Sequence, residues 1–369
     1  MSGRIDNLQK QLKKKNLGGL LISNYYNIFY LTGFKTLTKR EREAWTLVTN
    51  SNTYILSDGR YVNNLKSQIL NPKSKTKILK LLTPQRGLIS YLQEIIKEEK
   101  LRTIGFEGED LRVNELEKLR EKIPQAEFVS TEKLIIKLRE LKTKEEINKI
   151  KRACQIGDQC LKEIIPTIKL AQTEKEISFQ IEYWLKAKGF NIAFPTLVAI
   201  DQNSAIPHYD TESNGQEKVK KNSLILIDFG VVFQNYLSDI TRMIFFGKPK
   251  NEIVKIYNKL AEVQNKTVHC INTIEHLKQL DDCCRKLLID GGLPTHPHST
   301  GHGVGLEIHE YPKISSTSTD ALKPNQVFTI EPGIYFPGKW GMRIEDTINI
   351  GKNLKPIVLT KFPKDLIIL

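Results

Sequence analysis

Two short acidic patterns each occur twice in the second half of the sequence. In order along the chain, the paired copies are Ile227-Asp228-x-Gly230 with Ile330-Glu331-x-Gly333, and Asp239-x-Thr241 with Glu345-x-Thr347. Each copy of the first pattern ends a run of β-prone residues, and the offset between the copies is nearly the same for both patterns. The repetition predicts a duplicated unit with approximate two-fold symmetry, in which each half contributes a pair of acidic strands.

The acidic side chains of these patterns are expected on strands that are otherwise apolar. Because side chains alternate along a strand, Asp228 shares a face with Leu224 and Leu226, and Glu345 shares a face with Arg343. A buried carboxylate is costly unless it is protonated, paired with a cation or bound to a metal ion. Arg343 is the only evident nearby cationic partner, so ordinary ion pairs would leave carboxylates uncompensated. Metal binding is therefore the favoured interpretation.

The histidines are unevenly distributed, because four of the seven lie between His296 and His309. Glycines at positions 301, 303 and 305 interrupt this segment and would let its backbone approach a site closely. We expect His298, His302 and His309 to be functional, whereas His269, His276 and His296 are expected to be structural or surface residues.

Four carboxylates and one imidazole form a hard, oxygen-rich set of ligands. Such a set suits divalent manganese, cobalt or zinc better than a thiolate site would. With two such ions, the four negative and four positive charges cancel, and a bridging hydroxide can be added. Ions roughly 3.5–4 Å apart can generate a nucleophile at neutral pH. The chemistry that these residues predict is the activation of water by a pair of metal ions.

The elements that must position these residues fall into two predicted domains. Mixed strands and helices indicate a compact α/β domain over residues 1–130, and the charged segment 131–142 is expected to be a linker. In the remaining domain, residues 143–369, capping boxes at Thr143–Glu146 and Thr173–Glu176 begin two helices. Strand-like runs dominate residues 224–247 and 327–351. The second domain is therefore expected to be α/β or α+β.

Composition excludes several other classes of protein. The 369 residues are 40% hydrophobic, which is enough for a sizeable core. The net charge of +14 does not indicate nucleic-acid binding, because the lysines are dispersed among glutamates without an aromatic-interleaved basic strip. Apolar runs are short and the N-terminus lacks a secretory signal, so we expect a cytoplasmic protein that binds neither nucleic acid nor membrane. Five cysteines without a Cys-x-x-Cys pattern argue against a disulfide framework.

The five candidate ligands resemble those of a known family. Asp228, Asp239, His302, Glu331 and Glu345 match the pita-bread metallopeptidases in residue type and order. This family includes methionine aminopeptidase, aminopeptidase P, prolidase and creatinase. The stretches Asn203-Ser204-Ala205-Ile206-Pro207-His208 and Arg343-Ile344-Glu345-Asp346, together with the separate N-terminal domain, resemble its proline-specific branch. The resemblance implies a creatinase-like N-terminal α/β domain followed by a pseudo-two-fold pita-bread catalytic domain.

The resemblance also implies a role for each ligand. Asp239 and Glu345 would bridge two divalent ions, Asp228 would chelate one of them, and His302 with Glu331 would hold the other. Manganese is the expected ion, with cobalt or zinc as alternatives. Glu331 would in addition carry a proton toward the leaving proline nitrogen.

Four further residues are implied to contact the substrate. His309 and His208 resemble the histidines that contact the scissile carbonyl and the scissile nitrogen, which makes them catalytic as well as substrate-binding candidates. His298 and Arg343 resemble the groups that line the pocket for the proline side. For His298, support of the metal ligands from behind stays open as an equal alternative.

The predicted activity is that of a Xaa-Pro aminopeptidase, which releases an N-terminal residue that precedes proline in a short peptide. A prolidase, which cleaves only Xaa-Pro dipeptides, has the same ligands and stays open as the alternative. An inactive pita-bread module that binds peptides or histones is a more remote one. Because an X-Pro bond has no N–H, a metal site that polarises the carbonyl directly suits this substrate. We also expect a homodimer.

Overall fold

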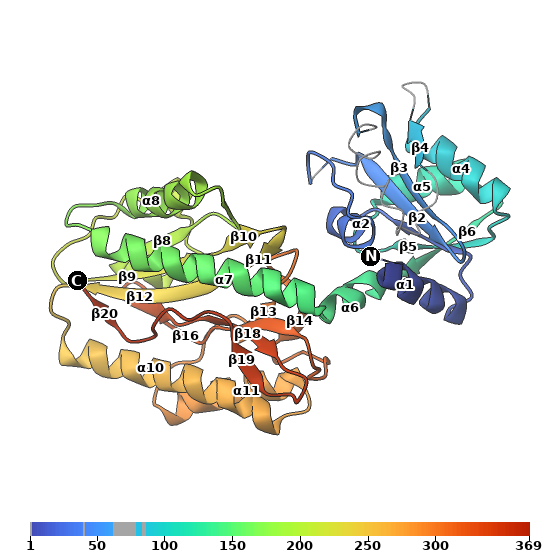
Figure 1. Ribbon diagram of the computed structural model, residues 1–369. Coiled ribbons are helices and arrows are strands. Elements are labelled where there is room, and N and C mark those ends of the chain that lie inside the picture. Colours follow the sequence, from blue (N-terminus) through green and yellow to red (C-terminus); the bar gives the residue numbers. More distant parts are fainter. Residues whose placement is uncertain (1, 40, 62–78, 83–85) are drawn as a thin grey trace. The chain divides into compact units, whose positions relative to one another are not determined.

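The computed structural model describes residues 2–39, 41–61, 79–82 and 86–369, and the chain divides into two compact units (Figure 1). The first unit ends at Arg139 and the second spans Glu140–Leu369. The segment 131–142, expected as a linker, includes helix α6 (Leu134–Glu140), most of which belongs to the first unit. No helix among the described residues is long and apolar enough to cross a membrane.

The first unit is built on a mixed six-stranded sheet in the order β4-β3-β2-β1-β5-β6. The strands are β1 (Gly19–Ile22), β2 (Ala44–Thr49), β3 (Thr53–Asp58), β4 (Leu79–Leu82), β5 (Thr103–Glu107) and β6 (Glu127–Thr131). Besides α6, its helices are α1 (Ser2–Lys14), α2 (Tyr25–Thr32), α4 (Leu88–Glu98) and α5 (Val113–Lys122). Strand β1 is buried on both faces, and its Leu21 packs in one cluster with Leu92 of α4 and Leu119 of α5.

The first half of the second unit places two helices against a four-stranded sheet. Its elements are α7 (Lys144–Ile164), α8 (Glu174–Ala187), β8 (Leu197–Ile200), β9 (Ser223–Phe229), β12 (Ile240–Phe246) and the distant β20 (Ile367–Ile368). Both helices begin at capping boxes, with Thr143 and Thr173 as N-caps, as the sequence predicts. The sheet order is β20-β12-β9-β8.

The second half repeats this arrangement. Helices α10 (Asn251–Cys270) and α11 (Leu277–Asp290) accompany a five-stranded sheet in the order β14-β13-β15-β18-β19. Its strands are β13 (Gly301–Gly303), β14 (Glu310–Ile314), β15 (Val327–Ile330), β18 (Asp346–Ile350) and β19 (Pro356–Val358). Short elements complete the unit: α9 (Thr211–Asn214), β7 (Asn191–Ile192), β10 (Val231–Phe233), β11 (Tyr236–Leu237), β16 (Gly333–Phe336) and β17 (Trp340–Arg343).

The acidic strand pairs of the two halves correspond to each other. In each half an antiparallel pair carries the repeated acidic patterns, β9 with β12 and β15 with β18. A bridge between Thr241 and Glu345 joins the two pairs. Helices α7 and α8 lie on one side of these strands, and α10 and α11 lie on the other (Figure 1). The duplicated unit that the sequence predicts is therefore present.

Alternation along β9 decides which residues face the site. Ile225, Ile227 and Phe229 pack in the cluster that α7 and α8 cover, whereas Leu224 and Leu226 pack in the cluster shared with α10 and α11. Asp228 follows the second set by period two, as expected. Its carboxylate is thereby directed toward the second half.

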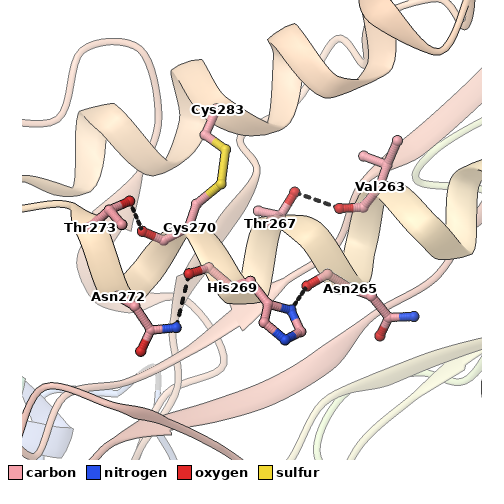
Figure 2. Close-up of a disulfide and its surroundings, with 8 residues drawn as sticks. All are labelled: Val263, Asn265, Thr267, His269, Cys270, Asn272, Thr273 and Cys283. Atoms are coloured by element: carbon pink, nitrogen blue, oxygen red, sulfur yellow. Dashed lines mark hydrogen bonds between the residues drawn. A yellow bond between two sulfur atoms is a disulfide. The ribbon is translucent and has the colours of Figure 1, made fainter.

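A disulfide between Cys270 and Cys283 joins the end of α10 to α11 (Figure 2). The cysteine pattern of the sequence argues against a disulfide framework, and this single bond was not expected. The odd count excludes complete pairing but not a single bridge, and a helical hairpin brings together two cysteines that are 13 positions apart. The remaining cysteines, Cys154, Cys160 and Cys284, are buried and free, as expected for small apolar side chains.

Candidate metal centre

The first half supplies two carboxylates from adjacent strands. Asp228 lies near the end of β9, and Asp239 directly precedes β12. The antiparallel register places Thr241 opposite Asp228. Asp239 is almost fully buried, with 4% of its surface exposed.

The second half supplies the histidine and the two glutamates. His302 is the central residue of β13, Glu331 directly follows β15, and Glu345 lies between β17 and β18. Thr329 Oγ1 accepts a hydrogen bond from the His302 backbone N–H and donates one to Glu331 Oε1, both at 3.2 Å. Gly301 is required here, because a Cβ would overlap the Thr329 carbonyl.

These side chains converge on one point. His302 Nε2 lies 3.5 Å from Asp239 Oδ2 and 3.4 Å from Glu331 Oε1. Asp239, His302 and Glu345 each offer a ligand atom, and these atoms all lie within 4.8 Å of one another. Asp228 and Glu331 are outside this group of three but line the same cavity, and Asp228 Oδ2 lies 2.5 Å from Arg343 Nη2. The structure thus brings three of the five expected ligands to one point and the other two to the wall of the same cavity.

Three carboxylate oxygens of the expected ligands are buried and have no hydrogen-bond partner among the described residues. They are Asp228 Oδ1, Asp239 Oδ1 and Glu345 Oε1. The other Glu345 oxygen, Oε2, accepts a hydrogen bond from Thr241 Oγ1 at 2.6 Å. A buried carboxylate oxygen without a donor is costly, and a cation would satisfy it. The residues present therefore fit a site for divalent metal.

The electrostatics point the same way. Burial, and then the neighbouring carboxylates, raise the pKa values of Asp239 and Glu345 well above their ordinary range. Burial also raises the pKa of Glu331. Burial lowers the pKa of His302, so that its imidazole is neutral and able to bind a metal ion. A divalent cation would favour the ionised carboxylates and offset the repulsion among them.

The convergence point opens into a cavity of about 630 Å³. All nine candidate site residues line it: Asp228, Asp239, His302, Glu331, Glu345, His208, His298, His309 and Arg343. The ring centroids of His302 and His309 are 4.3 Å apart, in an edge-to-face arrangement. Burial lowers the pKa values of His298 and His309 to about 4, so both are neutral at pH 7. His296, expected to be structural, is buried and contacts Thr300.

Tyr335 was not identified from the sequence, although it connects two of the expected residues. Its hydroxyl accepts a hydrogen bond from Arg343 Nη1 at 3.0 Å and lies 2.9 Å from His298 Nε2. Arg343 Nη1 also donates to the carbonyl of Pro207 at 3.1 Å. Arg343 is therefore tied to Asp228 as well as lining the cavity. The only feature of the sequence that could have identified Tyr335 as a site residue is its position in β16, the strand that follows Glu331.

The duplicated α/β unit surrounds a carboxylate and histidine cluster suited to divalent metal, which is typical of metal-dependent hydrolases. Comparison with known proteins gives the family. Residues 148–352 match the family model described as Metallopeptidase family M24, and residues 4–141 match the Creatinase/Prolidase N-terminal domain. The chain belongs to metallopeptidase family M24. The creatinase-like N-terminal domain and the pita-bread catalytic domain expected from the sequence are confirmed.

Relatives match over nearly the whole chain. The Xaa-Pro dipeptidase of Pyrococcus furiosus is 33% identical over 359 residues, which cover 96% of either chain. The solved structure of a Xaa-Pro dipeptidase from Bacillus anthracis is similar, with a TM-score of 0.90 and 31% identity, covering 100% of this chain and 99% of that one. The X-Pro aminopeptidase from Thermotoga maritima has a TM-score of 0.85 and 27% identity, covering 97% of this chain and 100% of that one.

Proposed function

We propose that this chain is a Xaa-Pro dipeptidase that uses two divalent metal ions. The main support for metal-dependent hydrolysis is a cluster around His302 of buried carboxylate oxygens that have no hydrogen-bond donor among the described residues. Support for the dipeptide substrate comes from the similarity to proteins named Xaa-Pro dipeptidase at 30% identity and above. These similarities favour the prolidase alternative over the aminopeptidase that we first expected from the sequence.

Five residues would hold the metal ions in this proposal. Asp239 and Glu345 would serve both ions, Asp228 would complete one site, and His302 with Glu331 would complete the other. Manganese is the proposed ion, and cobalt or zinc would also suit these ligands. When bound, the ions polarise the scissile carbonyl and lower the pKa of a water molecule.

The chain's own residues would bind the dipeptide and move the proton. A Glu331 carboxylate oxygen accepts the proton of the attacking water and returns it to the proline nitrogen, which needs a proton to leave. His309 and His208 contact the scissile carbonyl and the scissile nitrogen. Because His309 is neutral at pH 7, an imidazole N–H can donate to the carbonyl oxygen as negative charge develops there. His298 and Arg343 line the proline side of the cavity.

The proposal includes a homodimer and a cytoplasmic location, as expected from the sequence. Light scattering coupled to size-exclusion chromatography measures the first, and fractionation of the source cells measures the second.

A substrate panel tests the proposed specificity. The purified chain is loaded separately with Mn²⁺, Co²⁺ and Zn²⁺ and assayed on Ala-Pro, Ala-Pro-Ala, longer Xaa-Pro peptides and Ala-Ala. We expect hydrolysis of Ala-Pro, highest with Mn²⁺, and little hydrolysis of the others. If the N-terminal residue is released from Ala-Pro-Ala as fast as from Ala-Pro, the protein is an aminopeptidase and not a dipeptidase. Equal hydrolysis of Ala-Ala would remove the proline specificity.

A further inference from the structure

A buried ion pair lies beside the cavity. Lys142 Nζ is 2.7 Å from Glu310 Oε1, and the two side chains are only 1% and 6% exposed. The Lys266–Glu262 pair on α10 has the same length, but its side chains are 58% and 61% exposed. Burial of two charges costs about as much as their attraction returns, so stability alone gives little reason for a pair of this kind. A role in specifying local structure is the better explanation.

Glu310 holds the turn that carries His309. It directly follows His309, begins β14 and lines the cavity. Its backbone pairs with Gly303, so the segment 303–310 forms a closed loop. The Glu310 carboxylate lies so close to Gly305 inside this loop that a Cβ at position 305 would overlap it.

Lys142 belongs to a rigid support. It directly precedes Thr143, the N-cap of the 21-residue helix α7, and its backbone N–H donates to the carbonyl of Asn325 at 2.9 Å. A second set of hydrogen bonds connects the first turn of α7 to the loop 303–310. Glu146 accepts a hydrogen bond from the Tyr236 hydroxyl at 2.6 Å, and the next residue, Leu237, donates its N–H to the carbonyl of Gly305.

His309 depends on this loop for its position. Among the described residues, no group hydrogen-bonds to the His309 imidazole, which contacts the ring of His302 edge to face. With no hydrogen bond of its own among the described residues, the ring is located by the backbone of residues 303–310 and by its contact with the His302 ring. We propose that Lys142, through Glu310, is a positioning residue that holds the His309 imidazole in place for catalysis. This inference rests on the proposed function, in which His309 contacts the scissile carbonyl.

The first test measures Lys142→Met and Glu310→Gln in the Mn²⁺-loaded full chain, with Ala-Pro as substrate. A small displacement of a catalytic group lowers turnover steeply, so we expect kcat to fall about 10- to 100-fold in each variant. Metal content is expected to stay that of the wild type, because neither residue belongs to the ligand cluster. Lys266→Met, which breaks the exposed pair, is the matched control and is expected to keep the wild-type kcat.

A double-mutant cycle separates positioning from general destabilisation. If Lys142 acts through His309, adding Lys142→Met to His309→Ala lowers kcat no further than His309→Ala alone. Losses that multiply, or single variants with wild-type kcat and full metal content, would overturn the inference. If Lys142→Met does not fold, Glu310→Gln, which keeps the side-chain size, carries the same cycle.

A structural readout keeps the inference distinct from the proposed function. If the wild type hydrolyses none of the Xaa-Pro peptides, the proposed function fails, and crystal structures of the wild type and Glu310→Gln then decide the inference. A displaced or disordered His309 ring in the variant supports it. An unmoved, ordered ring contradicts it.

Discussion

Arg343 and Asp228 form a contact of 2.5 Å between Nη2 and Oδ2, at the edge of the ligand cluster. One oxygen of an expected metal ligand is thus neutralised by a guanidinium, while its other oxygen, Oδ1, is buried without a hydrogen-bond partner among the described residues. The same guanidinium donates to the hydroxyl of Tyr335, which in turn contacts His298. A continuous polar chain therefore connects a ligand of the metal centre to the wall of the cavity.

Replacement of Tyr335 by phenylalanine tests this chain of contacts. The Tyr335 hydroxyl is a hydrogen-bond partner of both Arg343 and His298. Its loss leaves each of these buried groups without one hydrogen bond, which costs about 1–3 kcal/mol of free energy. We expect reduced kcat/KM for Ala-Pro with unchanged metal content, measured by steady-state kinetics and elemental analysis. Tyr183→Phe, on the exposed surface of α8, is the control. Wild-type kinetics in Tyr335→Phe would show that the contact is dispensable.

Asp239→Asn and Glu345→Gln are expected to have opposite effects in the absence and presence of metal. Burial and neighbouring carboxylates raise the pKa of each acid, so each ionised form opposes folding as pH rises toward neutrality. Without metal, the neutral amide relieves this repulsion, and Tm at pH 7 should rise. With Mn²⁺, the variants should bind less metal and lose turnover. Thermal unfolding with chelator and with Mn²⁺ measures both effects; a lower Tm in the chelated variants would contradict the repulsion.

His309→Ala is expected to separate metal binding from catalysis. His309 lies beside His302 but is absent from the group that offers ligand atoms to one point, so the variant should keep its metal. Loss of a donor to the developing negative charge should lower kcat by about 100-fold or more. Parallel measurement of metal content and kcat decides the matter. If both ions were lost with the side chain, His309 would have to be reassigned as a ligand.

Stability of the first unit is expected to depend on Glu107. Burial raises its pKa from 4.5 to about 7, although it accepts hydrogen bonds from the backbone N–H groups of Ser23 and Asn24 and from the side chain of Asn27. The folded state binds the proton of the Glu107 carboxyl more tightly than the unfolded state does. Protonated Glu107 therefore stabilises the folded state fully below about pH 4.5, and this contribution is lost as pH rises through about 7. It amounts to at most about 3 kcal/mol.

The measurement compares wild type with Glu107→Gln by thermal unfolding of the metal-loaded chain from about pH 5 to about pH 8. The wild-type Tm should fall more over this range than that of the variant, because glutamine does not titrate. The carboxylates of the metal centre are present in both proteins, so the difference isolates Glu107. Identical pH dependence would show that Glu107 does not titrate in this range.

The catalytic unit could be predicted from the sequence because its determinants are repeated and local. The two copies of the acidic patterns predicted that the strand pair β9–β12 corresponds to the pair β15–β18. The alternation of side chains along a strand placed Asp228 on the correct face of β9. Capping boxes at Thr143 and Thr173 marked helix starts, since they act within one turn. All nine candidate residues line one cavity, although His208 and Arg343 were identified only through the resemblance to the family.

The rest depends on contacts between distant segments with no local pattern. Lys142 and Glu310 are ordinary charged residues until the fold buries them together, and Tyr335 acts only through two partners from other strands. The disulfide joins Cys270 to Cys283 only because α10 and α11 pack side by side. Discrimination between a dipeptidase and an aminopeptidase could not be predicted either, because the family resemblance implies the same five ligands for both activities.

The most direct test of the account is a titration of activity against bound metal. The chain is stripped with a chelator, reconstituted with increasing Mn²⁺, and assayed on Ala-Pro while bound metal is measured by elemental analysis. The account predicts no hydrolysis without metal and full activity at two ions per chain, as two-metal hydrolysis requires. Rapid hydrolysis of Ala-Pro by the stripped chain would contradict it.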